Sequence, residues 1–229
     1  MNRSSTFSLV AALALAGGIA CSDMISPSRS ARYDWRLFIT FDSAGPQVDT
    51  LSFHWPRTSL PVKIWVEDQF SVPQRIQEGI SLWRSAFLYH EWDARIVADS
   101  ATADVIVRTI LPPPLIFPAP PRLGAFVSSC IGATDIDTVN TRFQLRLPIR
   151  LYVYPSIPGA PDIDECLRTV AAHELGHSMG LFQHSSDSLD LMYGVPTADG
   201  LTNRDHGTAE NVYHYRADMV PFRPKTKAE

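Results

Sequence analysis

The sequence is poor in charged residues, and neither sign of charge dominates. Only 19% of its 229 residues are charged, and 20 Lys and Arg against 24 Asp and Glu leave a formal net charge of -4. Without a basic surface, the chain is not expected to bind nucleic acid. Heptad arrays and collagen-like repeats are also missing, and a hydrophobic fraction of 45% is ordinary for a globular core. The sequence therefore predicts one sizeable domain or two small ones.

The sequence also lacks an apolar segment of the roughly 20 residues that a membrane-spanning helix needs. Its apolar run at residues 9–16 is about half that length. Arg3 precedes this run, and the small residues Gly17, Gly18 and Ala20 follow it. This pattern is typical of an export signal, so residues 1–20 are predicted to be a signal peptide. A permanent membrane anchor is the weaker alternative.

Cysteine is scarce, with three in the chain, and the first follows the predicted signal peptide directly. The sequence Gly18-Ile19-Ala20-Cys21 resembles the lipobox of bacterial lipoproteins. The resemblance implies that Cys21 becomes the lipidated first residue of a cell-envelope protein, held to the membrane by acyl chains alone. Gly18 departs from the pattern, which prefers Leu, so ordinary cleavage after Ala20 and secretion remain the alternative.

Export would place the other two cysteines, Cys130 and Cys166, in an oxidising compartment. They are predicted to form a disulfide across a loop of about 36 residues, which would contribute about 3 to 4 kcal/mol to stability. The alternative is a thiolate that inhibits a metal centre, but the residues around them do not look like a known switch.

Glycine is less frequent than proline, with 12 residues against 18. This balance predicts long, stiff connections and not a chain made mostly of helix. The proline-rich residues 112–122 are expected to form an extended surface loop.

The hydrophobic pattern of the mature chain predicts an α+β fold. Apolar residues alternate with mostly polar ones at residues 33–41 and 51–55, which predicts a small β-hairpin. A helix containing a buried Trp83 is predicted after Ser71, with Ser71 and Gln74 as a capping box. Further strands are predicted at residues 60–66, 94–98, 103–109, 123–129 and 149–154. This order favours a mixed sheet with a crossover helix.

Three histidines and a glutamate in the last third of the chain form the pattern that carries chemistry. A helix is predicted over residues 163–179, begun by an acidic capping segment at residues 162–165. His173 and His177 are four residues apart and share one face of this helix. Gly180 can adopt the left-handed conformation that ends the helix, and His184 can then approach the same point.

Three imidazoles with an open fourth position are the ligand set of catalytic zinc. Glu174, beside the first histidine, is placed to accept a proton from a water molecule. Any one of these histidines alone would more often be structural. The full motif, however, specifies five positions, namely the three histidines, Glu174 and Gly180. With this chain's own residue usage, all five would coincide by chance roughly once in a hundred thousand. The sequence therefore predicts one Zn²⁺ held by His173, His177 and His184, with Glu174 as the catalytic residue.

This motif resembles the zinc motif of the metzincin clan of endopeptidases, and Met192 matches the clan's downstream Met-turn. In that clan the methionine forms an apolar floor below the metal, which implies a supporting role for Met192. The residues around His184 and Met192 look most like the matrixins, and weaker similarity extends over residues 57–216. The resemblance implies a metzincin-like zincin domain whose mixed twisted sheet carries an active-site helix and a C-terminal helix.

The predicted organisation is therefore a signal peptide at residues 1–20, a lipidated tether with the hairpin at residues 21–56, and a matrixin-like metallopeptidase domain at residues 57–229.

The sequence departs from the matrixins in the region that shapes their main specificity pocket. Gly194 stands where they usually carry proline, and the segment from Met192 to Leu201 is shorter than usual. Tyr193 directly follows the methionine, whereas the tyrosine ligand of astacins lies one position further on, so Tyr193 is assigned to packing. Asp135 and Asp137 could bind calcium, although loop aspartates are more often solvated turn residues.

The leading hypothesis is a zinc endopeptidase in which Glu174 takes a proton from the zinc-bound water as that water attacks the scissile carbonyl. By resemblance, residues 123–127 form the cleft edge and pair with an extended peptide or protein substrate. One rival is a non-catalytic surface lipoprotein that uses this fold for protein binding; intact Glu174 and the three-ligand motif count against it. A third hypothesis is that the hairpin covers the cleft, so that removing residues 22–56 raises activity.

Overall fold

The computed structural model describes residues 32–41, 47–114, 122–123, 125, 127, 129–137 and 142–224. The predicted signal peptide, Cys21 and its tether, and the middle of the proline-rich loop lie outside these ranges. Those assignments stay predictions. Within the described ranges, no helix is long and apolar enough to cross a membrane.

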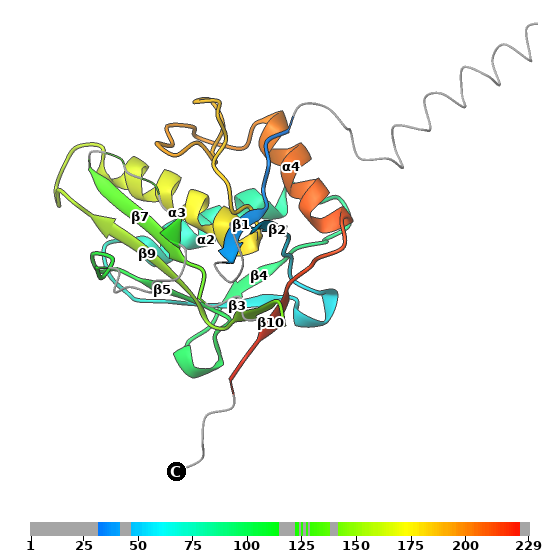
Figure 1. The fold of residues 1–229 in the computed structure, drawn as a ribbon. Coiled ribbons are helices and arrows are strands. Elements are labelled where there is room, and N and C mark those ends of the chain that lie inside the picture. The colour runs from blue at the N-terminus through cyan, green and yellow to red at the C-terminus, as the bar shows by residue number, and fades with distance from the viewer. Residues whose placement is uncertain are drawn as a thin grey trace, which may run out of the picture.

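The described residues form strands and three α-helices (Figure 1), and the predicted α+β class is confirmed. The strands are β1 (Leu37–Phe41), β2 (Gln47–Leu51), β3 (Val62–Val66), β4 (Ala94–Ile96), β5 (Val105–Arg108), β6 (Arg122–Leu123), β7 (Cys130–Asp135), β8 (Gln144–Arg146), β9 (Ile149–Pro155) and β10 (Val220–Phe222). The helices are α2 (Val72–Arg84), α3 (Ile163–Met179) and α4 (Asn203–His214), with 3₁₀ turns η1 (Arg57–Ser59) and η2 (Ser100–Thr102).

Six strands form the predicted mixed sheet, in the order β4-β3-β5-β9-β7-β6. β3 runs parallel to β4 and β5, and β5 runs parallel to β9. β7 is antiparallel to β9, and β6 is antiparallel to β7. Because neighbouring parallel strands need a crossover connection, α2 is the helix that carries the chain from β3 to β4. The antiparallel end of the sheet, β7 and β9, contacts α3.

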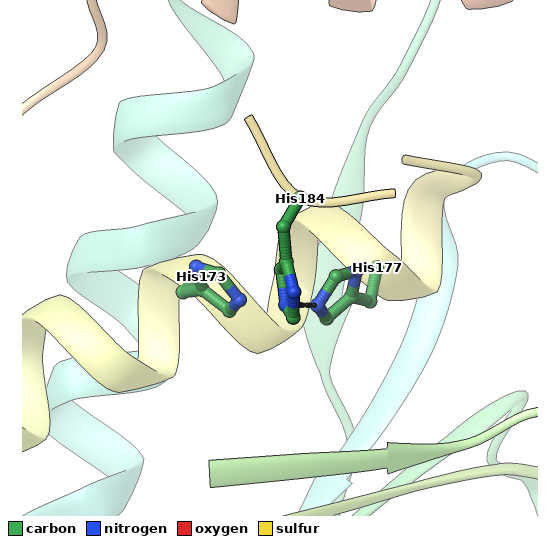
Figure 2. A group of neighbouring side chains, drawn as sticks. All are labelled: His173, His177 and His184. Atoms are coloured by element: carbon green, nitrogen blue, oxygen red, sulfur yellow. Dashed lines mark hydrogen bonds between the residues drawn. The ribbon is translucent and has the colours of Figure 1, made fainter. Parts of the chain in front are cut away.

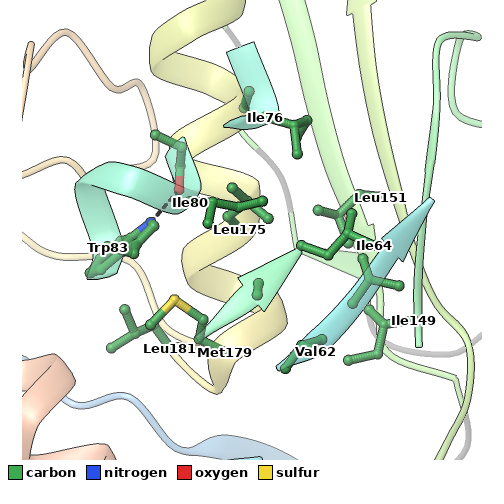
Figure 3. Close-up of a cluster of buried hydrophobic side chains, with 14 of the residues drawn as sticks. Val62, Ile64, Ile76, Ile80, Trp83, Ile149, Leu151, Leu175, Met179 and Leu181 are labelled. Atoms are coloured by element: carbon green, nitrogen blue, oxygen red, sulfur yellow. Dashed lines mark hydrogen bonds between the residues drawn. The ribbon is translucent and has the colours of Figure 1, made fainter. Parts of the chain in front are cut away.

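The hydrophobic core lies between this sheet and the helices α2 and α3 (Figure 3). α2 buries Ile76, Ile80 and Trp83 at helical spacing, as predicted for Trp83. The one polar atom of Trp83, its indole Nε1, donates a hydrogen bond of 2.7 Å to the carbonyl of Ala172 in α3. This bond joins the two helices and gives the buried indole N–H of Trp83 a partner.

The N-terminal hairpin is present, but it is not separate from the domain. β1 and β2 pair antiparallel, with Leu37 opposite Leu51. Tyr33, Phe53 and Trp55 flank the hairpin and belong to the same buried core as α3. The boundary predicted at residue 57 therefore cuts through one packing unit, which in the described part of the chain begins at residue 32.

Both helices begin after the predicted N-cap residues, Ser71 and Asp162, but neither side chain makes the predicted capping bond. Ser71 has a left-handed backbone with φ 58° and makes no capping bond, and its hydroxyl donates instead to Asp164 at 3.1 Å. Asp162 likewise makes no capping bond, because its carboxylate accepts hydrogen bonds from Ser129 Oγ at 2.7 and 2.8 Å. Both side chains bond across to other elements, which a local pattern does not reveal.

The sheet edge also differs from the prediction. Of the strand expected over residues 123–129, Leu123 lies in β6, and Ala125 and Val127 hydrogen-bond to β7, whereas residues 124, 126 and 128 lie outside the described residues. β7 itself was missed because Gly132, Thr134 and Asp135 give it no alternating pattern. β8 and β10, of three residues each, were also missed, and they form a separate parallel pair.

Cys130, the first residue of β7, forms a disulfide with Cys166 in the first turn of α3. Replacing both cysteines by serine is expected to lower the free energy of unfolding by about 3 to 4 kcal/mol, because the unfolded chain regains the freedom of a long loop. Denaturant titration of the oxidised protein measures this loss. Wild type measured after reduction is the control and should lose about as much, and unchanged stability of the double variant would contradict the prediction.

Candidate metal centre

Three histidine side chains converge at the C-terminal end of α3 (Figure 2). His173 and His177 project from one face of the helix and are buried, whereas His184 comes from the chain after the helix and is exposed. One ring nitrogen from each lies within 4.8 Å of the other two. The structure thus brings together the three ligands predicted from sequence.

Gly180 makes this convergence possible. Its backbone has φ 117°, and its N–H closes the last turn of α3 by donating to His177 O at 3.1 Å. A Cβ at this position would overlap the carbonyl oxygen of Phe53. Glycine is therefore required both for the left-handed turn and for the close passage of the N-terminal segment.

Backbone carbonyls orient the two helical imidazoles. Nδ1 of His173 is 2.8 Å from the carbonyl of Leu191, and Nδ1 of His177 is 2.6 Å from the carbonyl of Leu181. Because a carbonyl only accepts, each Nδ1 carries the proton and each Nε2 presents a lone pair. Metal-binding histidines are oriented in the same way in other proteins.

The free lone pairs are left without donors. Nε2 of His173 is buried with no hydrogen-bond partner, and Nε2 of His177 lies 3.2 Å from Nε2 of His184. A divalent cation would satisfy these nitrogens together, and imidazole is a preferred ligand of zinc. The residues present therefore fit a zinc ion.

Burial favours the neutral, metal-binding form of all three rings. It lowers the pKa of His173 to about 3, and it lowers the pKa of His177 well below the ordinary value. The pKa of His184 is lowered for the same reason. A buried cationic imidazole would be poorly solvated, so the protein holds these rings ready for a metal.

Glu174 is buried beside the histidines and makes no ion pair among the described residues. Its Oε2 accepts a hydrogen bond of 2.6 Å from Thr134 Oγ1, and its Oε1 accepts one of 3.2 Å from the backbone N–H of Ala125. Burial raises the pKa of Glu174 to about 8, although both hydrogen bonds oppose the rise. A Cβ at Gly132 would overlap the carboxylate, so β7 accommodates Glu174 only because residue 132 is glycine.

Met192 packs beneath the helix and is not a ligand. It is buried, and a Cβ at Gly176 of α3 would overlap its Sδ. Asp205 at the start of α4 holds this turn by accepting hydrogen bonds from the N–H groups of Leu191, at 2.9 Å, and of Met192, at 3.4 Å. The same turn presents the carbonyl of Leu191 to the imidazole of His173.

The other sequence candidates lie outside the centre. Among the histidine, cysteine, aspartate and glutamate side chains of the described residues, the group able to hold a metal consists of the three histidines. The assignment of Tyr193 to packing stays a prediction from sequence. Asp135 pairs with Arg122 and Asp137 lies near Arg146 and Arg150, so these arginines compete with the calcium site considered above. Gly194 lies against His184, where a Cβ would be 3.3 Å from Nδ1.

Sequence reasoning missed the contacts that hold the site together. Gly132 and Thr134 belong to β7, which was not predicted, whereas Ala125 lies in the predicted cleft edge but its contact with Glu174 was not foreseen. The carbonyls of Leu181 and Leu191 carry no side-chain signal. Their roles depend on long-range contacts.

A cavity of 190 Å³ lies between α2, α3 and the segment after His184, and its lining includes the charged residues Glu78, Arg168 and Asp199. Its walls include Leu82 of α2, Thr169 and Ala172 of α3, and Leu191 with Ala198 from the segment after His184. The segment that the sequence left open as the wall of a specificity pocket therefore borders a small, largely apolar cavity.

Comparison with known proteins agrees with this geometry. Residues 137–214 match the family model of the matrixins, Peptidase_M10, in a region that contains α3, all three histidines and Met192. No curated protein matches the chain. The family match and the three-histidine group together support a matrixin-like metallopeptidase, and the matrixin family is zinc-dependent.

Zinc is expected to bind in a ratio of one ion per chain and to stabilise the fold. Free zinc at 100 times its dissociation constant should add about 2.7 kcal/mol to the free energy of unfolding. Thermal unfolding with and without zinc measures this gain. His177→Ala should lose most of it, whereas His206→Ala, in α4 and outside the centre, should keep it. Equal zinc binding by the two variants would contradict the assignment.

Proposed function

We propose that this protein is a zinc-dependent endopeptidase that hydrolyses peptide bonds in peptide or protein substrates. The observation that carries the proposal is the convergence of three imidazoles on one point, with a buried carboxylate on the residue next to the first. Within the described residues, no further histidine, cysteine, aspartate or glutamate belongs to this group, which is the open arrangement expected of a catalytic site.

Zinc, when bound, supplies Lewis-acid polarisation of the substrate carbonyl and lowers the pKa of water at the site. Glu174 takes a proton from the attacking water and returns it to the leaving amine. Burial raises the pKa of Glu174, which makes its carboxylate a stronger base than an exposed one. Thr134 and the N–H of Ala125 hold its two oxygens and fix the direction from which it accepts the proton.

The substrate is proposed to bind along the sheet edge formed by β6 and the residues after it. β6 is the last strand of the sheet, and Ala125 contacts Glu174 directly. An extended peptide added beside this edge would lie next to the carboxylate. The cavity bordered by Ala172 and Ala198 is proposed to receive an apolar substrate side chain.

The protein is proposed to act after export, attached to the cell envelope through Cys21. This rests on the N-terminal sequence pattern, and a disulfide between Cys130 and Cys166 suits an oxidising compartment. Secretion after ordinary cleavage is the alternative.

The function is tested by cleavage of a broad peptide library with the purified mature protein. Glu174→Gln keeps the size of the side chain but removes the base, so the rate is expected to fall by roughly a hundredfold or more while zinc stays bound. Glu210→Gln, in α4 and outside both the metal centre and the lining of the cavity, is the matched control. Zinc bound equally by wild type and Glu174→Gln, with cleavage by neither, would favour the non-catalytic binding protein.

Gly132→Ala provides a second test, of how the base is held. The added methyl group should displace the Glu174 carboxylate and lower kcat by roughly 10- to 100-fold. Zinc stoichiometry should not change, because no ligand contacts residue 132. Gly200→Ala is the control, since a Cβ there meets nothing within 4 Å. A Gly132→Ala protein with wild-type kcat would show that the position of the Glu174 carboxylate does not depend on the space left by the missing side chain at residue 132.

A further inference from the structure

The zinc ligands differ in how their rings are held. His173 and His177 lie on a buried helix, and a carbonyl fixes each Nδ1. His184 is exposed and lies on an irregular segment, and its ring has no carbonyl partner among the described residues. The position of His184 therefore depends on its backbone, which is held on both sides. After it, the N–H of Ser185 donates to the carbonyl of Met192 at 2.8 Å. Before it lie residues 178–183, which we call the ligand turn.

Two hydrogen bonds attach the end of the ligand turn to the N-terminal segment. The N–H of Phe182 donates to the carbonyl of Trp35 at 2.8 Å. The side-chain amide of Gln183 donates to the carbonyl of Arg36 at 3.0 Å. These bonds fix the two residues that immediately precede His184.

The start of the ligand turn is attached to the residues after the hairpin. Trp55 Nε1 donates to the carbonyl of Ser178 at 2.9 Å. The carbonyl of Phe53 passes directly over Gly180, and the ring of Phe53 lies 6.3 Å from that of Phe182 between centroids. The N-terminal strap, defined as residues 33–36 and 52–55, thus contacts the ligand turn at both ends.

The strap also reaches the support of the first ligand. The hydroxyl of Tyr33 donates to Asp205 Oδ1 at 2.9 Å. The other oxygen of Asp205 accepts the N–H of Leu191, whose carbonyl orients His173. One segment therefore contacts the structures that place His184 and His173.

We propose that the N-terminal strap is a positioning element of the zinc centre, and that zinc affinity depends on it. This inference rests on the proposed function. It predicts the opposite outcome from a hairpin that covers the cleft: loosening the strap weakens zinc binding and does not release a latent activity.

The test compares zinc affinity in the full mature protein after the strap contacts are removed. Tyr33→Phe, Trp55→Phe and Gln183→Met together delete three hydrogen bonds and keep the hydrophobic bulk. The dissociation constant for zinc, measured by competition with a chelating dye, is expected to rise at least tenfold. The visible spectrum of the cobalt-substituted protein should change as His184 moves. Val105→Ala, in β5 of the sheet, is the control for general loss of stability.

Thermal unfolding of the metal-free and zinc-loaded forms separates positioning from stability. A positioning role requires the strap variant to gain less stability from zinc than wild type, whereas Val105→Ala should gain as much as wild type. Equal zinc gain and equal zinc affinity in strap variant and wild type would overturn the inference. Failure of wild type itself to bind zinc would instead overturn the proposed function.

A single substitution keeps the test valid if the triple variant does not fold. Gln183→Met alone removes one hydrogen bond next to His184 and is expected to weaken zinc binding about threefold. Gln74→Met removes a comparable bond, from Gln74 to Glu78 on the surface of α2, and should leave zinc affinity unchanged. Equal affinities in these two variants would overturn the inference.

Discussion

Burial of polar side chains on α3 is the constraint on which the rest of the structure depends. His173, Glu174 and His177 are fully buried in a hydrophobic core, where an unpaired polar atom costs about 1 to 3 kcal/mol. Their partners are the carbonyls of Leu181 and Leu191, the Thr134 hydroxyl and a backbone N–H, all outside the helix. The hydrogen bonds that these side chains of α3 require therefore fix the sheet edge on one side of the helix and the Met192 turn on the other.

Three glycines mark the places where another group must approach the motif more closely than a side chain would allow. Gly132 makes room for the Glu174 carboxylate, Gly176 for the sulfur of Met192, and Gly180 for the carbonyl of Phe53. Only Gly180 also needs its left-handed backbone. Close packing thus sets the positions of Glu174, of Met192 and of the turn that leads to His184. A single methyl group added at one of these glycines would displace the residue packed against it.

The sequence predicts what is local and periodic. The bounds of α3 and the convergence of its histidines with His184 follow from helical spacing and from one glycine, and the mixed sheet follows from runs of apolar residues. β7 is different, because its glycine and polar residues serve Glu174 and so give no strand pattern. The bonds made by Ser71 and Asp162, and the inclusion of Tyr33, Phe53 and Trp55 in the core, depend on partners far away in the sequence, so no local rule could reveal them.

This division also explains why the family match covers only part of the site. Residues 137–214 contain the three ligands, Glu174 and Met192, which are the groups that define the chemistry. The groups that hold Glu174, namely Thr134, Gly132 and Ala125, precede that region, and so does the strap that fixes the ligand turn. A fragment limited to residues 137–214 would carry all three histidines yet leave Glu174 without its hydrogen bonds and the ligand turn without its contacts to the strap. The unit that the proposed function requires therefore extends from the strap to α4.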